Sequence, residues 1–305
     1  MDAEKAFLAA ERRVFEDYGL DVASRFLELR EPALRTRVLQ AGDGPPLLFV
    51  HGGGGFASQW VSLMASLPGW RSIAVDRPGC GLTDYFDYRG TDLRQHSVAF
   101  FGSLLDALEV ERLPIVANSM GATWSIFFAV EHPERVSSLS LLGCPALFPG
   151  TGAPLWLRAL SWGPTRRALM KLRRPRPDRM RLGLSKLLGE QAATTITAAE
   201  IDSMQLAQRL PGASDSFGSL LGRMLTPWGA RRGAGITRDE LRRMVLPTLL
   251  VWGRQDPFGE LAAAEQAAAL LPQGKLEVID AGHQPWSGQP ERCAAIVCAH
   301  LSATG

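Results

Sequence analysis

A serine between small residues follows directly on an apolar run and is the first candidate for chemistry. Ser119 lies three residues after the run Leu113–Val116, with Ala117 two positions before it and Gly121 two positions after it. This pattern predicts a strand, a tight turn and a helix that begins at Met120, so that the hydroxyl stands above the helix N-terminus. The motif matches G-x-S-x-G, with alanine in the first place. We therefore expect Ser119 to be a nucleophile.

An acid and a histidine follow two later apolar runs. Asp256 comes four residues after Trp252, and His283 comes four residues after Ile279. The carboxyl ends of parallel strands share one edge of a sheet, so these loops are expected to meet there. A serine hydroxyl needs a base, which would be His283, and a carboxylate, which would be Asp256, to fix the tautomer of that base. Asp280 competes for the second role, but it is too close in sequence to His283 for an easy contact.

A fourth loop, His51–Gly55, contains four consecutive glycines after the run Pro46–Val50. Glycine lets the backbone approach a substrate closely, and backbone N–H groups can stabilise the negative charge of a tetrahedral intermediate. We expect Gly53 and Met120 to donate these N–H groups. The alternative, a phosphate-binding loop, lacks both the G-x-G-x-x-G spacing and the Lys-Ser/Thr pair of a P-loop.

Apolar runs that alternate with helical patterns indicate the fold that must hold these loops. The pattern predicts an α/β class with repeated βαβ winding. We expect a core from residues 1–146 and 245–305, in which residues 1–20 add an amphipathic helix that lies on the body or holds a partner chain. Residues 147–244 carry helical segments and frequent Pro and Gly but no convincing buried strand, which predicts an inserted helical cap.

Bulk properties exclude several other classes. The chain has 305 residues, 46% of them hydrophobic, and a formal charge of +2, which gives no overall attraction to nucleic acid. The charged first twenty residues do not resemble a signal peptide, and no apolar run reaches membrane-spanning length. The four cysteines have no metal-ligand or disulfide spacing, so we expect no metal, no cofactor and a cytoplasmic protein. Cys80 and Cys144 are expected to be buried fillers rather than reactive thiols.

Together these motifs resemble the α/β-hydrolase fold family over nearly the whole chain. They are HGGGG at 51–55, DRPGCG at 76–81, ANSMG at 117–121, WGRQD at 252–256 and GH at 282–283. The resemblance implies a mostly parallel sheet with a cap after the sixth strand, and it puts the nucleophile, acid and base of the family on Ser119, Asp256 and His283. Locally the chain is most similar to the carboxylesterase branch and to hydrolases of carbon–carbon bonds in ring-cleavage products, whose N-S-M-G-G elbow differs here by Ala122.

The expected substrate is a small molecule, a carboxylic ester with apolar groups, cleaved through an acyl-enzyme. Carbon–carbon hydrolysis of diketone acids is one alternative, and a non-catalytic ligand-binding protein is another. Gly54, Asn118, Phe258, Trp286 and, less directly, Trp228 are expected to border the pocket. The sequence is also compatible with a homodimer.

The predicted cap carries a strip of basic residues. We expect this strip to be the solvent-exposed face of a helix. The alternatives are that it attracts an acidic substrate, a membrane surface or an acidic partner. The strip comprises Arg158, Arg166, Arg167, Lys171, Arg173, Arg174, Arg176, Arg179, Arg181 and Lys186.

Overall fold

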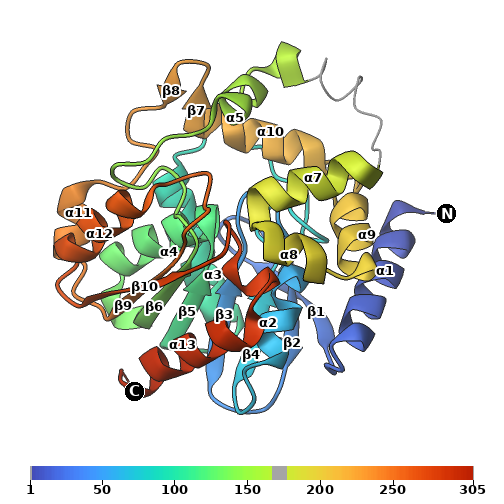
Figure 1. The fold of residues 1–305 in the computed structure, drawn as a ribbon, viewed down its shortest axis with the longest axis horizontal. Coiled ribbons are helices and arrows are strands. Elements are labelled where there is room, and N and C mark those ends of the chain that lie inside the picture. The colour runs from blue at the N-terminus through green and yellow to red at the C-terminus, as the bar shows by residue number, and fades with distance from the viewer. Residues whose placement is uncertain (1, 167–176, 305) are drawn as a thin grey trace.

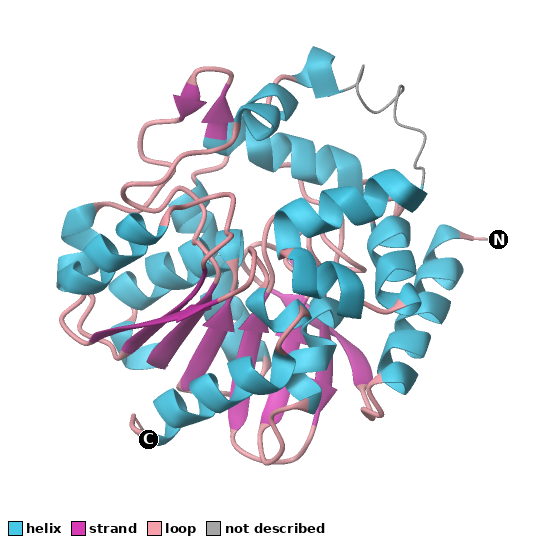
Figure 2. Ribbon diagram, viewed as in Figure 1, coloured by secondary structure: helices cyan, strands magenta, loops and turns pink. Residues whose placement is uncertain are grey.

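A central sheet of eight strands forms the body of the protein in a computed structural model that describes residues 2–166 and 177–304 (Figure 2). The strand order is β1-β2-β4-β3-β5-β6-β9-β10, with β2 antiparallel to both β1 and β4 and the remaining neighbours parallel. The bounds are β1 (Ala23–Leu29), β2 (Leu34–Ala41), β3 (Pro46–Val50), β4 (Arg71–Val75), β5 (Leu113–Ala117), β6 (Val136–Leu142), β9 (Thr248–Gly253) and β10 (Gly274–Ile279). The sequence prediction of a mostly parallel α/β sheet is confirmed.

Helices cover both faces of the sheet (Figure 1), which explains why a central strand such as β3 is continuously apolar. One face packs against α3 (Leu93–Ala107), α4 (Ser119–Glu131), α11 (Arg238–Arg243) and α12 (Leu261–Leu270). The other face packs against η1 (Ala57–Trp60), α2 (Val61–Ala65) and α13 (Pro290–Ser302). The short 3-10 turn η3 (Pro285–Ser287) adds to the core, whereas η2 (Pro133–Arg135) has no buried residue. The sheet is therefore buried in the middle, and only the ends of its strands are left to form a site.

The segment between β6 and β9 rises above the carboxyl ends of the parallel strands (Figure 1). Its described elements above the sheet are α5 (Leu155–Leu160), α7 (Pro177–Leu188), α8 (Glu190–Thr195), α9 (Ala198–Ala207), α10 (Ala213–Met224) and a hairpin of β7 (Leu225–Thr226) and β8 (Gly229–Ala230), whereas α11 returns to the face of the sheet. The sequence predicted no buried strand in this segment. The described part of the structure differs from that prediction only in this short hairpin, whose strands have two residues each. Five residues of the predicted basic strip lie outside the described residues, namely Arg167, Lys171, Arg173, Arg174 and Arg176.

The N-terminal helix α1 (Ala3–Asp17) connects this segment to the core. On one side Glu11 accepts a hydrogen bond of 2.7 Å from the guanidinium of Arg37 in β2, and both side chains are almost completely buried. On another side Arg13 forms an ion pair of 2.8 Å with Asp202 of α9. The first helix therefore lies against β2 on one side and α9 on the other. Among the described residues, no helix has both the length and the apolar character needed to cross a membrane.

Candidate functional site

Ser119 lies at the sharp turn between β5 and α4. Its backbone φ is +51°, a left-handed value that is strained for a non-glycine residue. The turn presses α4 against β3, because a Cβ atom at Gly121 would lie 2.4 Å from the carbonyl oxygen of Val50. Only glycine can therefore occupy position 121. Ala117, which takes the place of the other expected glycine, is fully buried at the end of β5.

His283 and Asp256 form a hydrogen bond of 2.9 Å between Nδ1 of the ring and Oδ2 of the carboxylate. Asp256 also accepts bonds from the backbone N–H groups of Cys144 at 2.8 Å and Phe258 at 2.9 Å, which fix its orientation. An ionised carboxylate only accepts, so Nδ1 carries the proton and Nε2 is the nitrogen that can act as a base. Asp280, the competing acid, instead accepts a bond from the side chain of Gln255.

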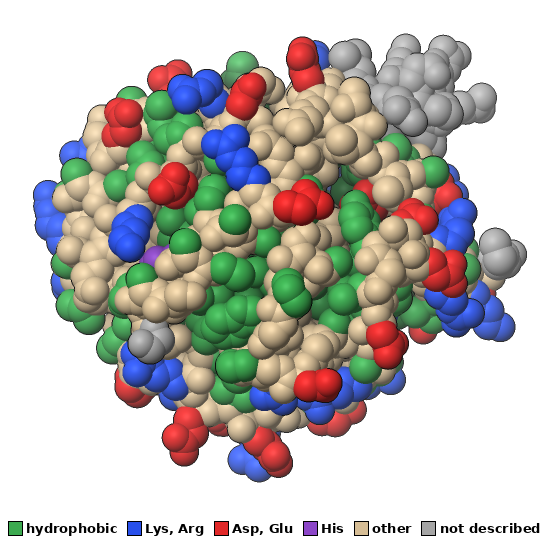
Figure 3. Space-filling view, turned by 60° about the horizontal axis from the view of Figure 1, so that its bottom comes forward, with side chains coloured by type: hydrophobic (Ala, Val, Ile, Leu, Met, Phe, Trp, Pro, Cys, Tyr) green, Lys and Arg blue, Asp and Glu red, His purple; other side chains and the backbone are tan. Residues whose placement is uncertain are grey.

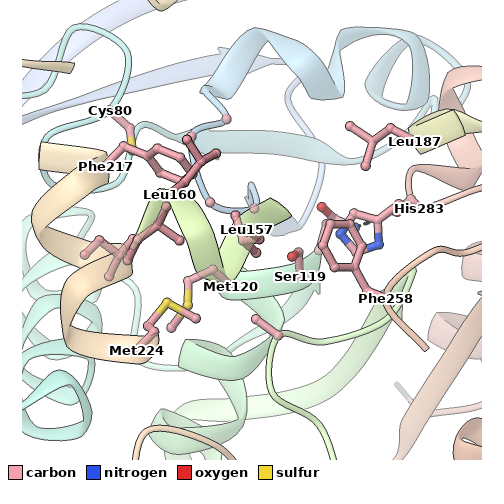
Figure 4. Close-up of a pocket in the computed structure, with 18 of the residues that line it drawn as sticks. Cys80, Ser119, Met120, Leu157, Leu160, Leu187, Phe217, Met224, Phe258 and His283 are labelled. Carbon is pink, nitrogen blue, oxygen red and sulfur yellow. Dashed lines mark hydrogen bonds between the residues drawn. The ribbon is translucent and has the colours of Figure 1, made fainter. Parts of the chain in front are cut away.

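Ser119 and His283 line the same cavity, and Figure 4 shows both side chains at one end of it. No hydrogen bond joins the Ser119 hydroxyl to the ring, although both residues belong to the described part of the chain. A bond between a nucleophile and its base is often long in the absence of substrate and shortens in the complex. The structure thus brings His283 and Asp256 into direct contact and places Ser119 on the adjoining cavity wall.

The loop that begins at His51 is held by three donors on one carbonyl oxygen. The oxygen of Gly52 lies 2.7 Å from Nη2 of Arg77, 2.8 Å from Nδ1 of His51 and 3.2 Å from the N–H nitrogen of Gly55. Burial, and then the charge of Arg77, hold the pKa of His51 well below its ordinary value, so the ring is neutral. Its Nε2 accepts a bond of 3.0 Å from the backbone N–H of Arg77, which leaves Nδ1–H to donate to Gly52.

This arrangement determines where the N–H of Gly53 points. In a trans peptide the N–H is directed opposite to the preceding carbonyl, so the Gly53 N–H faces away from Arg77. Gly53 and Met120 both line the cavity. Met120 is the second residue of α4, where backbone N–H groups have no partner within the helix. Two N–H groups are therefore available at the wall that holds Ser119.

Two residues contribute more to this geometry than the sequence suggested. Asn118, expected only as a pocket residue, donates from Nδ2 to the carbonyl oxygens of Leu142 at 2.6 Å and His283 at 2.9 Å. It thereby ties the turn at Ser119 to the loop of the candidate base. Arg77 was not predicted to take part at all. The available signal was its place directly after β4 within the DRPGCG motif, which puts a cation at the carboxyl edge of the sheet.

The cavity has a volume of about 390 Å³ and is bordered mostly by apolar side chains from α5, α7, α9 and α10 (Figure 4). Gly54, Asn118 and Phe258 line it as expected, and the Phe258 ring lies 4.3 Å from that of His283 between centroids. Among the described lining residues, Arg166 is the one Lys or Arg, and no Asp or Glu is present.

The prediction that Trp286 and Trp228 border the pocket is wrong. Trp286 does not border the cavity, because the turn η3 directs its ring against Trp60, with stacked centroids 4.0 Å apart, and its indole N–H donates to the oxygen of Gln59. Trp228 also lies away from the cavity and is 83% exposed on the β7–β8 hairpin. In both cases the direction of the side chain after a tight turn could not be predicted from the sequence.

The cysteines do not compete with Ser119 as nucleophiles. Burial, and then the nearby Asp256 carboxylate, raise the pKa of Cys144 well above its ordinary value, and burial raises that of Cys80. Both thiols therefore stay protonated at neutral pH. Within residues 2–166 and 177–304, no cluster of His, Cys, Asp and Glu side chains could hold a metal ion.

Known proteins show the same architecture. A family model described as alpha/beta hydrolase fold matches residues 45–285. A 2-hydroxy-6-oxononadienedioate/2-hydroxy-6-oxononatrienedioate hydrolase of Pseudomonas putida is 28% identical over 277 residues, which are 86% of this chain and 90% of that protein.

Two solved structures are similar in fold. Carboxylesterase CesB of Bacillus subtilis superposes with a TM-score of 0.75 at 18% identity, over 99% of each chain. The meta-cleavage product hydrolase CumD of Pseudomonas fluorescens superposes with a TM-score of 0.71 at 21% identity, over 92% of this chain and 98% of that one. Because the family model spans most of the sequence, the chain belongs to the alpha/beta hydrolase fold family.

Proposed function

We propose that the protein is a serine hydrolase that cleaves carboxylic esters with apolar groups through an acyl-enzyme. The observation that carries this proposal is the 2.9 Å bond between His283 and Asp256 at the cavity into which the turn presents Ser119. A histidine held by a carboxylate can remove the serine proton during attack and return it to the leaving group. Neither the nucleophile nor the base needs a metal or a cofactor for this chemistry.

In the proposed reaction, the oxygen of Ser119 attacks the ester carbonyl carbon while Nε2 of His283 takes the hydroxyl proton. The N–H groups of Gly53 and Met120 would stabilise the resulting oxyanion, at roughly 3–4 kcal/mol for a donor of this kind. His283 then protonates the departing alkoxide, which leaves an acyl group on Ser119. A water molecule, deprotonated by His283, releases the acid and regenerates the hydroxyl.

An ester with apolar groups fits the cavity best. The described walls are rich in Leu, Met and Phe, and they offer a neutral substrate a volume of about 390 Å³ without an unpaired carboxylate nearby. We further propose that residues 147–244 act as the cap over this cavity, because α5, α9 and α10 supply much of its lining.

Carbon–carbon bond hydrolysis is the second candidate. It is favoured by the names of relatives such as the Pseudomonas putida hydrolase and by the sequence Asn118–Gly121, which matches the elbow of those enzymes. A diketone acid carries a carboxylate, and Arg166 would be the one described cation of the cavity wall available to it.

The decisive experiment is hydrolysis of p-nitrophenyl butyrate by the wild type, Ser119→Ala and the matched control Ser125→Ala. Ser125 lies in the same helix and bonds to the oxygen of Gly121, away from the cavity. We expect Ser119→Ala to abolish turnover and Ser125→Ala to retain it. A parallel assay with a vinylogous diketone acid separates the two enzymatic candidates. A protein that binds such compounds without turnover would instead be a ligand-binding member of the family.

A further inference from the structure

Four large apolar side chains are exposed together on the segment above the sheet. Their exposed fractions are 76% for Leu155, 54% for Trp156, 58% for Trp162 and 83% for Trp228. We call these four residues the tryptophan patch. Figure 1 shows α5 beside the β7–β8 hairpin at the top of the molecule. The Arg158 guanidinium joins the two by donating to the carbonyl oxygen of Pro227 at 2.6 and 2.9 Å, directly beside Trp228.

The charged residues of the two segments that carry the tryptophan patch are all basic. Residues 147–166 and 225–237 contain no Asp or Glu but include Arg158, Arg166, Arg231 and Arg232. Arg158 and Arg231 donate to backbone carbonyl oxygens rather than to carboxylates, so their charge is not neutralised. On the face shown in Figure 3, by contrast, Lys and Arg side chains lie among Asp and Glu side chains.

The tryptophan patch is continuous with the candidate active site. Trp156 is exposed and also lines the cavity, as do Leu157 and Leu160 of the same helix. The Trp156 ring contacts Phe258, with centroids 6.3 Å apart, and Phe258 in turn contacts His283. An apolar molecule at the tryptophan patch would therefore have a continuous apolar path to the candidate base.

We propose that the tryptophan patch and the neighbouring Arg158, Arg231 and Arg232 bind the surface of an anionic lipid membrane, peripherally and reversibly. Indole rings favour the boundary between headgroups and acyl chains, and cations near the surface are attracted by anionic lipids. A second copy of this chain is a poorer occupant, since a two-fold contact would place the arginines of one copy against those of the other. The cavity wall at Trp156 then lies next to the lipid, from which a lipid-like ester could reach the cavity.

The test is co-sedimentation with vesicles of phosphatidylcholine and phosphatidylglycerol (70:30) and with vesicles of phosphatidylcholine alone, in 50 and 500 mM NaCl. We expect the wild type to bind the anionic vesicles at low salt and to bind less at high salt and on neutral vesicles. A double variant that combines Trp162→Ser with Trp228→Ser should reduce binding to the anionic vesicles at least tenfold. Phe26→Ser is the matched control, since Phe26 is an aromatic residue 41% exposed on β1, and it should bind as the wild type does.

The charge is tested separately with the pair Arg231→Gln and Arg232→Gln. At about 1 kcal/mol for each cation near an anionic surface, this pair should weaken binding to anionic vesicles about 25-fold. Neither position lines the cavity, so hydrolysis of a soluble ester should stay unchanged.

The proposal is overturned if the wild type binds neither vesicle, or if the double tryptophan variant binds as well as the wild type. A dimer in sedimentation velocity that the tryptophan variant abolishes, without vesicle binding, would assign the surface to a second copy. Capture of an acidic protein without vesicle binding would likewise reject the membrane. Ser119→Ala should bind vesicles normally, so failure of the proposed catalysis and failure of this proposal give different results.

Discussion

Replacement of Arg77 by methionine tests how the oxyanion loop is held. The Arg77 side chain is completely buried and donates from Nη2 to the oxygen of Gly52 at 2.7 Å and from Nε to the oxygen of His51 at 3.0 Å. Methionine fills a similar volume but donates nothing. The Gly52 oxygen then keeps only His51 and Gly55 as donors, and the peptide that directs the Gly53 N–H can rotate more freely.

The size of the effect follows from these contacts. Complete loss of one oxyanion donor lowers kcat by about 10²- to 10³-fold. Because two of the three donors on Gly52 remain, we expect a smaller loss of about 10- to 100-fold. It should appear in kcat rather than in KM, since the oxyanion charge develops only in the transition state. The free energy of unfolding should fall by about 3–6 kcal/mol, since two charge-assisted hydrogen bonds are lost.

Kinetics with p-nitrophenyl butyrate and urea unfolding separate the two effects. The control is Arg37→Met, an equally buried arginine whose loss leaves Glu11 without its 2.7 Å partner and Asp76 without a cation at 3.7 Å. That variant should lose about 3–5 kcal/mol of stability, yet the kcat of its folded molecules should change no more than about threefold, because Arg37 does not contact the loop at Gly52. Arg77→Lys should restore part of the activity. An unchanged kcat in Arg77→Met, or an equal loss in Arg37→Met, would refute the reasoning.

Three further substitutions test other parts of the account. Asp256→Asn should lower kcat by about 10⁴-fold, because the amide no longer enforces the required tautomer, whereas the control Asp280→Asn should have ordinary ester kinetics. Burial, and then the charge of Arg77, lower the pKa of His96 to about 4, so only the unfolded chain takes up this proton between pH 6.5 and pH 4. The free energy of unfolding should therefore fall by up to about 3 kcal/mol more in the wild type than in His96→Phe as the pH drops from 7 to 4 in urea titrations; parallel pH curves would contradict this. Gly121→Ala should not give folded protein at 37 °C, as judged by circular dichroism, because its Cβ would lie 2.4 Å from the Val50 oxygen; a native melting curve would count against the geometry of the turn.

Much of the architecture could be predicted because it depends on apolar runs. The runs Pro46–Val50, Arg71–Val75 and Val136–Leu142 are strands with the expected bounds, since a strand covered on both faces is built mainly from apolar and small side chains. Once the strands were located, the loops that follow them could be placed at one edge of the sheet, because parallel strands have their carboxyl ends at the same edge. Chain order and strand ends alone therefore indicated the meeting of His283 and Asp256.

The details that depend on side chain direction could not be predicted. Trp286 and Phe258 both lie near sequence motifs of the site, but a 3-10 turn directs Trp286 into the core while Phe258 faces His283. Arg77 was given no role from the sequence, because only the tertiary structure brings carbonyl oxygens of another loop to its guanidinium. The short helices η1 and α2 were also not recognised from the sequence. Their apolar residues, such as Trp60 and Leu63, show no clear helical periodicity over so short a segment.

The central claim is that Ser119 is the residue acylated during turnover. The most direct measurement is mass spectrometry of the protein after reaction with a fluorophosphonate, which modifies serines activated by a base. We predict one adduct per chain, located on Ser119, absent from Ser119→Ala and formed much more slowly in His283→Ala. Ester hydrolysis that continues in a protein whose adduct lies on another residue, or that forms no adduct, would contradict the account.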